Sequence, residues 1–256
     1  MRSRFLIMIL FFMFFLLAAA ILWPAASLAP WVERGSNGKL RLASAEGQVW
    51  NGSGVLLVRK GDSATSHSAE SVQWKIRWGN LWRGRIGIEA GFENGSALAS
   101  IGQDSLDIEQ IDATLGVTLL GALLPGPLGR FGWAGSLNVK GKDFSCALKG
   151  RICQGEMEML WRDAGVSEIP GGDLGDYRIR LMGEGQVLRF DLATLRGRLQ
   201  IAGGGEISAG ALRFAGEASA IGPASAQLNN FLRTIGRQGS TPEKILIDYR
   251  STEPGS

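Results

Sequence analysis

Val72-Gln73-Trp74-Lys75-Ile76-Arg77-Trp78 alternates between apolar and polar side chains at every position. Successive side chains of a β-strand point to opposite faces, so this pattern predicts a strand with one apolar face and one charged face. The same period returns at Ile111–Val117, Trp133–Val139, Tyr177–Leu181 and Leu212–Ala218. We therefore expect a series of half-buried antiparallel strands.

The composition agrees with a β-rich fold and narrows the function. The chain has 256 residues, of which 45% are hydrophobic and 20% charged, with 37 Gly and 8 Pro. Glycine is about double its usual ~7% share and has no collagen-like period, which is typical of a turn-dense β protein. The 27 Lys and Arg nearly balance the 24 Asp and Glu, and two of the basic residues, Arg2 and Arg4, precede a hydrophobic segment. Because no basic surface remains, we expect no nucleic-acid partner.

The N-terminus contains an uninterrupted apolar segment, Phe5–Trp23, of 19 residues. About 20 such residues span the core of a bilayer as a helix, and Arg2 and Arg4 place the N-terminus on the cytoplasmic side. A cleaved signal peptide is the alternative, because Ala18–Ala20 resembles a cleavage site. We expect an uncleaved anchor, since the apolar segment continues to Trp23, a residue suited to the membrane interface.

The expected organisation follows from these signals. Residues 1–4 are cytoplasmic, residues 5–23 form a transmembrane signal anchor, and residues 24–256 form one periplasmic domain of a single-pass inner-membrane protein. The domain is mainly β: one elongated, curved antiparallel sheet that forms an open groove or a sandwich. Apolar residues at helical spacing predict a short capping helix at about 224–237, and residues 251–256 are expected to be a disordered tail.

One hairpin is predicted with its register. Asn94-Gly95 favours a two-residue type I′ turn between two alternating segments. This turn pairs Phe92 with Ala97 and Ala90 with Ala99, and all four side chains then share one apolar face.

The two cysteines are expected to form a disulfide. Lys149-Gly150 predicts a turn that sets Cys146 directly opposite Cys153. An exported domain lies in an oxidising compartment, where such a pair is oxidised. Two buried free thiols are the alternative.

The sequence predicts no catalytic residue, metal site or cofactor. His67 is the only histidine, and the chain has two cysteines. These three residues do not supply the ligands of most zinc sites or the histidine-based triads of nucleophilic enzymes. Gly183-Glu184-Gly185 lacks the third glycine of a dinucleotide-binding motif, and Gly203-Gly204-Gly205 lacks the Lys and Ser/Thr of a phosphate loop. We therefore expect that the protein is not an enzyme. A glycan-active enzyme, with two carboxylates converging in a cleft, is an alternative that a structure can test.

Tryptophans and basic residues are interleaved in one segment. Such interleaving is found in proteins that bind single-stranded nucleic acid. For an exported chain we expect instead that the tryptophans lie on the core face and the basic residues in solvent. The residues are Trp74, Trp78 and Trp82 with Lys75, Arg77, Arg83 and Arg85.

Short segments in a fixed order run through nearly the whole chain. They are Trp23–Ala25, Leu40–Ala43, Glu46–Ser53, Trp74–Trp78, Leu81–Arg85, Leu160–Ala164, Leu174–Tyr177, Leu195–Leu199 and Leu228–Gly236. Their order and spacing resemble the type II secretion system protein N (GspN) family. The resemblance implies an accessory inner-membrane component of the type II secretion pathway in Gram-negative bacteria. It implies partners among the other secretion components, protein–protein contacts in the periplasm, and no catalytic residues.

Eight residues within these segments are family-like positions to which we assign a structural role. Trp50 and Gly52, for example, are interpreted as a bulky side chain beside a tight turn that needs glycine. The eight are Trp50, Gly52, Trp74, Trp78, Gly84, Trp161, Gly175 and Tyr177.

The alternative function is that of an AsmA-like, lipid-handling protein of the periplasm. A long, glycine-rich sheet with one apolar face can form a groove for acyl chains, and small side chains such as Ala90 and Ala113 leave room for them. This argument is an analogy at the level of the fold. A closed, packed core would favour the secretion component, and an open apolar face would favour lipid handling.

Overall fold

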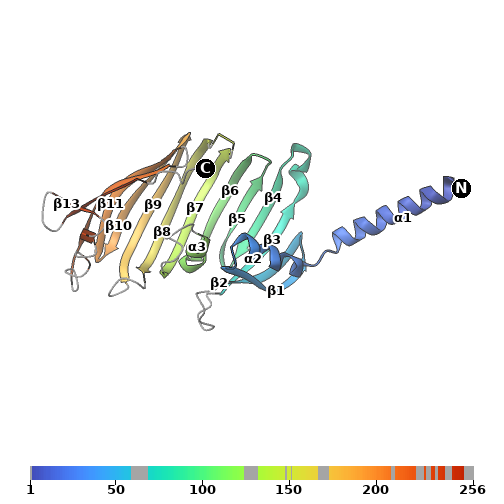
Figure 1. Ribbon diagram of the computed structural model, residues 1–256, viewed down its shortest axis with the longest axis horizontal. Helices are drawn as coiled ribbons and strands as arrows, with labels where there is room; N and C mark the ends of the chain where they lie inside the picture. The colour runs from blue at the N-terminus through green and yellow to red at the C-terminus, as the bar shows by residue number, and fades with distance from the viewer. Residues whose placement is uncertain are drawn as a thin grey trace.

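The computed structural model consists of one long sheet with helices at its N-terminal end (Figure 1). It describes residues 2–58, 69–123, 132–147, 149–150, 152–166, 173–208, 211–222, 228, 232–233, 236–239 and 244–250, apart from the side chains of residues 2–6, 16–20, 80, 120 and 122–123. Most of the expected capping helix at 224–237 and the whole expected tail at 251–256 lie outside these residues.

Helical segments occupy the first part of the chain. α1 (Arg2–Ile21) is followed by the 3-10 helix η1 (Ala25–Leu28) and by α2 (Ala29–Gly35), and the shorter segments η2 (Trp78–Arg83) and α3 (Val117–Leu123) connect strands. Figure 1 shows α1 projecting away from the sheet beside its first strands. Over the part of the chain that the structure describes, no helix combines the length and the hydropathy needed to cross a membrane.

Fourteen strands of the described chain form one antiparallel sheet. Its order is β1 to β12 in sequence, followed by β14 and then β13. The mainly β, antiparallel fold predicted from the sequence is confirmed, and the sheet is open and single-layered rather than a sandwich. The strands are β1 (Leu40–Gln48), β2 (Asn51–Val58), β3 (Ala69–Arg77), β4 (Ile86–Phe92), β5 (Asn94–Ile101), β6 (Ser105–Gly116), β7 (Trp133–Ala147), β8 (Ile152–Val166), β9 (Asp173–Gly185), β10 (Val187–Gly197), β11 (Leu199–Ser208), β12 (Ala211–Ala220), β13 (Arg237–Gln238) and β14 (Ile245–Arg250).

The strand register gathers the apolar side chains on one side of the sheet. Val139 pairs with Ala113 and with Met159, and Ile179 pairs with Met159 and with Leu192, so one apolar row crosses five strands. The apolar face, as we call this side, follows from the alternation in the sequence, because directly paired residues share a face. Its principal residues are Val72, Trp74, Ile88, Phe92, Ile111, Val139, Met157, Met159, Ile179, Leu181, Phe190, Leu192 and Phe214.

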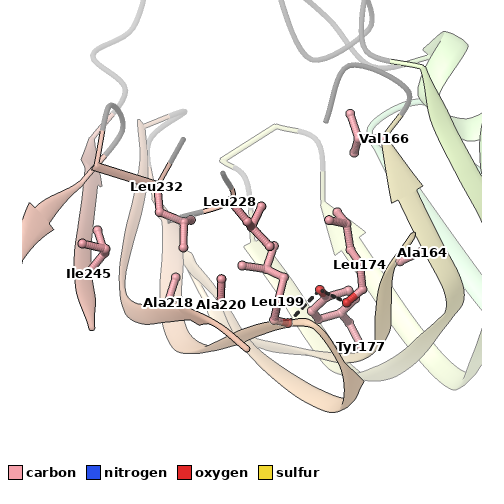
Figure 2. Packing of buried hydrophobic residues seen from close by; sticks show 10 residues of the cluster. All are labelled: Ala164, Val166, Leu174, Tyr177, Leu199, Ala218, Ala220, Leu228, Leu232 and Ile245. Atoms are coloured by element: carbon pink, nitrogen blue, oxygen red, sulfur yellow. Dashed lines mark hydrogen bonds between the residues drawn. The ribbon is translucent and has the colours of Figure 1, made fainter. Parts of the chain in front are cut away.

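Buried residues are concentrated along one rim of the sheet. The even-numbered strands from β2 to β12 end at this rim, which we call the covered rim. We call the opposite rim, where the odd-numbered strands end, the open rim. Near the C-terminus, Leu228 and Leu232 lie over Leu199, Ala218 and Ala220, as Figure 2 shows. A second, smaller cluster joins Leu40, Val58 and Leu119, with Val32 of α2 packed against it. The hydrophobic core therefore covers only part of the apolar face.

The predicted Asn94-Gly95 register is wrong by two residues. The structure pairs Phe92 with Gly95 and Ala90 with Ala97. A shift of two keeps every side chain on its predicted face, which is why the apolar pattern survives. Gly95 has φ +127°, and a Cβ there would lie 2.1 Å from the carbonyl oxygen of Asp112. The glycine therefore serves the close approach of β5 to β6 rather than the turn.

The two cysteines lie opposite each other across β7 and β8. The register pairs Cys146 directly with Cys153. The structure joins them by a disulfide, with the two Cα atoms 4.1 Å apart.

Candidate functional site

The middle of the apolar face is open to solvent. Phe92, Met157, Ile179 and Leu192 are only partly buried, although each lies among apolar neighbours on adjacent strands. Towards the open rim, several large apolar side chains of this face are exposed. These are Ile86, Ile101, Ile207 and Tyr249. A continuous, solvent-accessible apolar surface of this kind is typical of a binding surface rather than of a finished core.

Glycines flatten the apolar face in its C-terminal half. A Cβ at Gly205 would lie 2.4 Å from Cζ of Phe190, so the phenyl ring lies directly over that glycine. Phe214 covers Gly203 and Gly216 in the same way. The two rings stack with centroids 6.0 Å apart and an interplanar angle of 7°. Aromatic rings that lie across glycines produce a smooth apolar surface and protect the underlying backbone.

The opposite face of the sheet carries paired charges. Arg180 lies 3.1 Å from Glu156 and 3.6 Å from Glu158, and Lys140 lies 3.5 Å from Asp112. All of these side chains are exposed, so each pair contributes little to stability. The carboxylates Glu156 and Glu158 thus share one arginine on an open surface, which is not the cleft that a glycan-active enzyme needs. Among the described residues, no group of His, Cys, Asp and Glu is placed to hold a metal ion.

Two of the family-like segments, Leu174–Tyr177 and Leu195–Leu199, meet at the covered rim. The hydroxyl of Tyr177 lies 2.9 Å from the carbonyl oxygen of Leu199 and 3.3 Å from that of Leu174. The ring is buried, and this burial raises the pKa of the tyrosine. Tyr177 therefore acts as a neutral hydrogen-bond donor that connects β9 to β11.

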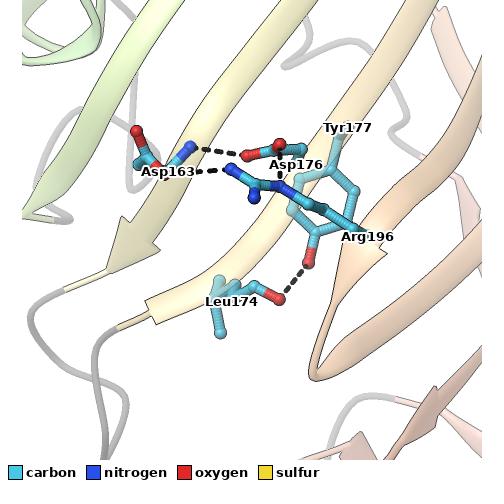
Figure 3. A network of polar contacts seen from close by, with 5 residues as sticks. All are labelled: Asp163, Leu174, Asp176, Tyr177 and Arg196. Carbon is cyan, nitrogen blue, oxygen red and sulfur yellow. Dashed lines mark hydrogen bonds and ion pairs between the residues drawn. The ribbon is translucent and has the colours of Figure 1, made fainter.

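Asp176, next to the tyrosine in the chain, joins a polar network on the other side of the sheet (Figure 3). Nε of Arg196 donates a hydrogen bond to its Oδ2, and the backbone N–H of Asp163 donates to its Oδ1 at 2.8 Å. These two donors lower the pKa of Asp176, with the arginine as the larger cause. Figure 3 shows Asp163 and Arg196 converging on the Asp176 carboxylate from neighbouring strands.

Gly175, the predicted glycine of this segment, allows a close contact between two backbones. Its φ is +136°, and a Cβ would lie 2.2 Å from the carbonyl oxygen of Arg196. Gly197 opposite it has the same φ. Only glycine can occupy such a conformation at such a distance.

A second group of family-like residues surrounds the turn between β1 and β2. The indole N–H of Trp74 donates a hydrogen bond to the carbonyl oxygen of Val49 at 2.9 Å, and its ring lies over Gly52. Trp50 contacts Trp78 edge-to-face, with centroids 5.0 Å apart. The structure thus brings Trp50, Gly52, Trp74 and Trp78 together.

The expectation that all tryptophans of the interleaved segment lie on the core face is wrong. Trp74 is partly buried on the apolar face, but Trp78 is 45% exposed and Trp82 is 76% exposed. The reason is that β3 ends at Arg77 and the chain continues as η2, which has no strand period. Gly84, with φ +68°, follows η2, and its N–H donates to the carbonyl oxygen of Leu81.

Trp161 lies on β8 and reaches both of its neighbouring strands. Its indole N–H donates to the carbonyl oxygen of Ala134 at 3.0 Å. Its ring contacts Trp133 at 5.4 Å and Tyr177 at 5.8 Å between centroids. This residue therefore links the aromatic packing of β7 to the tyrosine on β9.

Sequence reasoning missed the aromatic residues that cover glycines and the arginine that holds Asp176. The signal that could have revealed Phe190 and Phe214 is a glycine opposite each of them. Both phenylalanines pair with Gly205 on the strand between them. Arg196 lies in the family-like segment Leu195–Leu199, but nothing in the sequence connects it to Asp176.

Comparison with known protein families matches residues 38–242 to type II secretion system (T2SS), protein N. The match covers most of the chain, from the start of β1 to the segment before β14. No curated protein and no solved structure matches the chain. The matched family is a secretion component and not a known enzyme family. The chain therefore belongs to the type II secretion system protein N family, and it is a component of a secretion machinery of the bacterial envelope.

Proposed function

We propose that this protein is an accessory inner-membrane component of the type II secretion pathway that binds another secretion component in the periplasm through its apolar face. Family membership supports the pathway. The open apolar face offers a surface for the contact, although its openness by itself favours the lipid-handling alternative treated below. The protein supports the export of folded proteins across the outer membrane by this contact and performs no catalysis itself.

The membrane anchor of the proposal is α1. Its 20 residues make a helix about 30 Å long, which equals the thickness of a bilayer core. The described apolar side chains between Ile7 and Phe15 are all exposed, so they have no protein to pack against in this chain. The argument for an anchor comes from the sequence of the whole segment Phe5–Trp23. Some side chains of this segment are not among those that the structure describes. Arg2 and Arg4 orient it with residues 24–256 in the periplasm.

Packing on the apolar face is favoured over pairing at a sheet edge. The outer edge of β1 is irregular, with a register shift between Ala43 and Glu46 and with η1 in contact with it. The strand at the other edge, β13, is only two residues long. Short and irregular edges are common devices against strand addition. The apolar face offers the larger surface, and its burial in a complex is favourable.

Lipid handling remains the second candidate, and one observation favours it. The apolar face is open rather than packed, which is the arrangement expected of a groove for acyl chains. Its exposed apolar side chains lie at the open rim, and the chain leaves α1 at that same rim, where the backbone N–H of Val49 donates to Trp23. A lipid leaving the membrane would meet the apolar face there.

Photocrosslinking in living cells distinguishes the two candidates. Photoreactive residues at Phe92, Met157 and Phe190 report the apolar face, and the same residue at Lys140 and Arg178 reports the opposite face. Discrete protein adducts from the apolar face only, lost when the other secretion genes are deleted, support the secretion contact. Adducts with the mass of phospholipid or lipopolysaccharide, unaffected by those deletions, support lipid handling. Equal protein adducts from both faces contradict the proposed use of the apolar face.

A further inference from the structure

The connection between β3 and β4 exposes a compact group of aromatic, aliphatic and cationic side chains. Leu81 is 52% exposed and Trp82 76% exposed within the short segment η2. The guanidinium of Arg83 lies over the indole of Trp82, 4.3 Å from its centroid. No carboxylate among the described residues pairs with Arg83. Large apolar side chains are rarely exposed together without a partner.

This group lies at the open rim, close to the point where the chain leaves α1. The backbone N–H of Val49 donates to the carbonyl oxygen of Trp23 at 2.9 Å, which fixes the end of α1 against the β1–β2 turn. From that turn, the ring of Trp50 contacts Trp78, the first residue of η2. The N–H of Ile76 donates to the carbonyl oxygen of Trp50 at 2.7 Å. One aromatic contact and two backbone hydrogen bonds thus connect the anchor to η2.

The chemistry of the group matches the surface of a bilayer. Indole rings prefer the headgroup region, because one edge is apolar and the N–H is polar. A guanidinium binds phosphate oxygens, and Arg83 lies beside the tryptophan. Anionic lipids attract such a cation by about 1 kcal/mol at the membrane surface.

We propose that η2 docks on the periplasmic surface of the membrane that α1 spans, with Leu81 and Trp82 among the headgroups and Arg83 on lipid phosphates. This inference rests on the anchor of the proposed function. Two attachment points, α1 and η2, fix the tilt of the sheet, which a single helix followed by a short connection leaves free. The open rim with Ile86 and Ile101 then faces the bilayer.

Fluorescence quenching by lipid tests the docking in the full chain. The chain is reconstituted in vesicles of phosphatidylethanolamine and phosphatidylglycerol that carry a fraction of brominated lipid. A fluorescent label is attached to Leu81→Cys, with Leu195→Cys as the matched control. Leu195 is a leucine of equal exposure, 53%, near the covered rim. The parent chain without an added cysteine measures any labelling of Cys146 and Cys153, and a label at Phe11→Cys reports the anchor.

We expect a loss of fluorescence at positions 11 and 81 and none at 195. Quenching at 11 without quenching at 81 overturns the docking and leaves the anchor intact. Absence of quenching at 11 overturns the anchor itself. Replacing phosphatidylglycerol by phosphatidylcholine should reduce the quenching at 81, and unchanged quenching would contradict the attraction of Arg83 to anionic lipid. In the anionic vesicles, Trp82→Ser should also reduce the quenching at 81 while leaving that at 11 as it is.

Discussion

Tyr177 on β9 reaches past β10 to donate a hydrogen bond to the carbonyl oxygen of Leu199 on β11, at 2.9 Å. One buried hydroxyl thereby connects β9 to β11 across the strand between them, at the covered rim. Replacing it by Tyr177→Phe leaves the ring in place and removes the donor. We expect a loss of about 1 kcal/mol in the free energy of unfolding, measured by denaturant titration of the full chain in detergent. Tyr249→Phe, at an exposed tyrosine, should change nothing, and equal effects of the two changes would contradict this role.

Asp176 makes the free energy of unfolding depend on pH in the acidic range. Its pKa lies below the ordinary value of 3.8, chiefly because of the hydrogen bond from Arg196. A group whose pKa is lowered by folding stabilises the native state above its unfolded pKa, and this stability is lost as the pH falls through the folded pKa. The loss should therefore begin below 3.8. Unfolding measured across that range should show a smaller acid loss for Asp176→Asn. Arg196→Gln should give the same flattening, and a double variant that behaves additively would argue against a shared contact.

Gly175→Ala tests the close contact of β9 with β10. The added Cβ would lie 2.2 Å from a carbonyl oxygen, at a φ of +136° that alanine rarely adopts. The backbone strain alone costs about 1–3 kcal/mol, and the clash adds to it. Thermal unfolding of the variant should occur well below that of the parent. Gly35→Ala is the control, because a Cβ at Gly35 meets nothing within 4 Å.

In the periplasmic location that we propose, the disulfide should be present and should stabilise the protein. Peptide mass spectrometry without reduction should find Cys146 linked to Cys153. The double change Cys146→Ser and Cys153→Ser should lower the free energy of unfolding by about 2.5 kcal/mol, since the bond closes a short loop. Free thiols in protein purified from the periplasmic side would contradict this prediction, whatever the stability of the double variant.

Much of the fold could be predicted because many strands show a local alternation of apolar and polar side chains in the sequence. Val72–Arg77 alternates strictly, and β3 occupies these residues. The pattern continues formally to Trp78, but the strand ends before it. A period of two does not say where hydrogen bonding to the next strand stops, so the exposure of Trp78 and Trp82 was not predicted.

The strand register was harder to predict, because it also depends on contacts with strands outside the hairpin. Asn94-Gly95 predicts a turn when only β4 and β5 are considered. In the structure the glycine instead lies against Asp112 of β6. The contact of Asp176 with Arg196 was likewise out of reach, because it depends on a register shift between Thr194 and Arg196. The positions Gly175 and Tyr177 came from the family resemblance, and their hydrogen bonds came from the structure.

The sequential order of the strands has a consequence for how the chain assembles during synthesis. From β1 to β12 each strand pairs with the one made just before it, so a growing chain never has to hold a strand for a distant partner. Most of these hairpins close a short loop, which is fast and costs little entropy; the longer connections are those from β2 to β3 and from β6 to β7. The sheet can therefore lengthen strand by strand from the N-terminal end, with only its newest strand unpaired. β14 then inserts beside β12, and Leu232 and Ile245 close the covered rim, so the C-terminal segment ends the growth of the sheet.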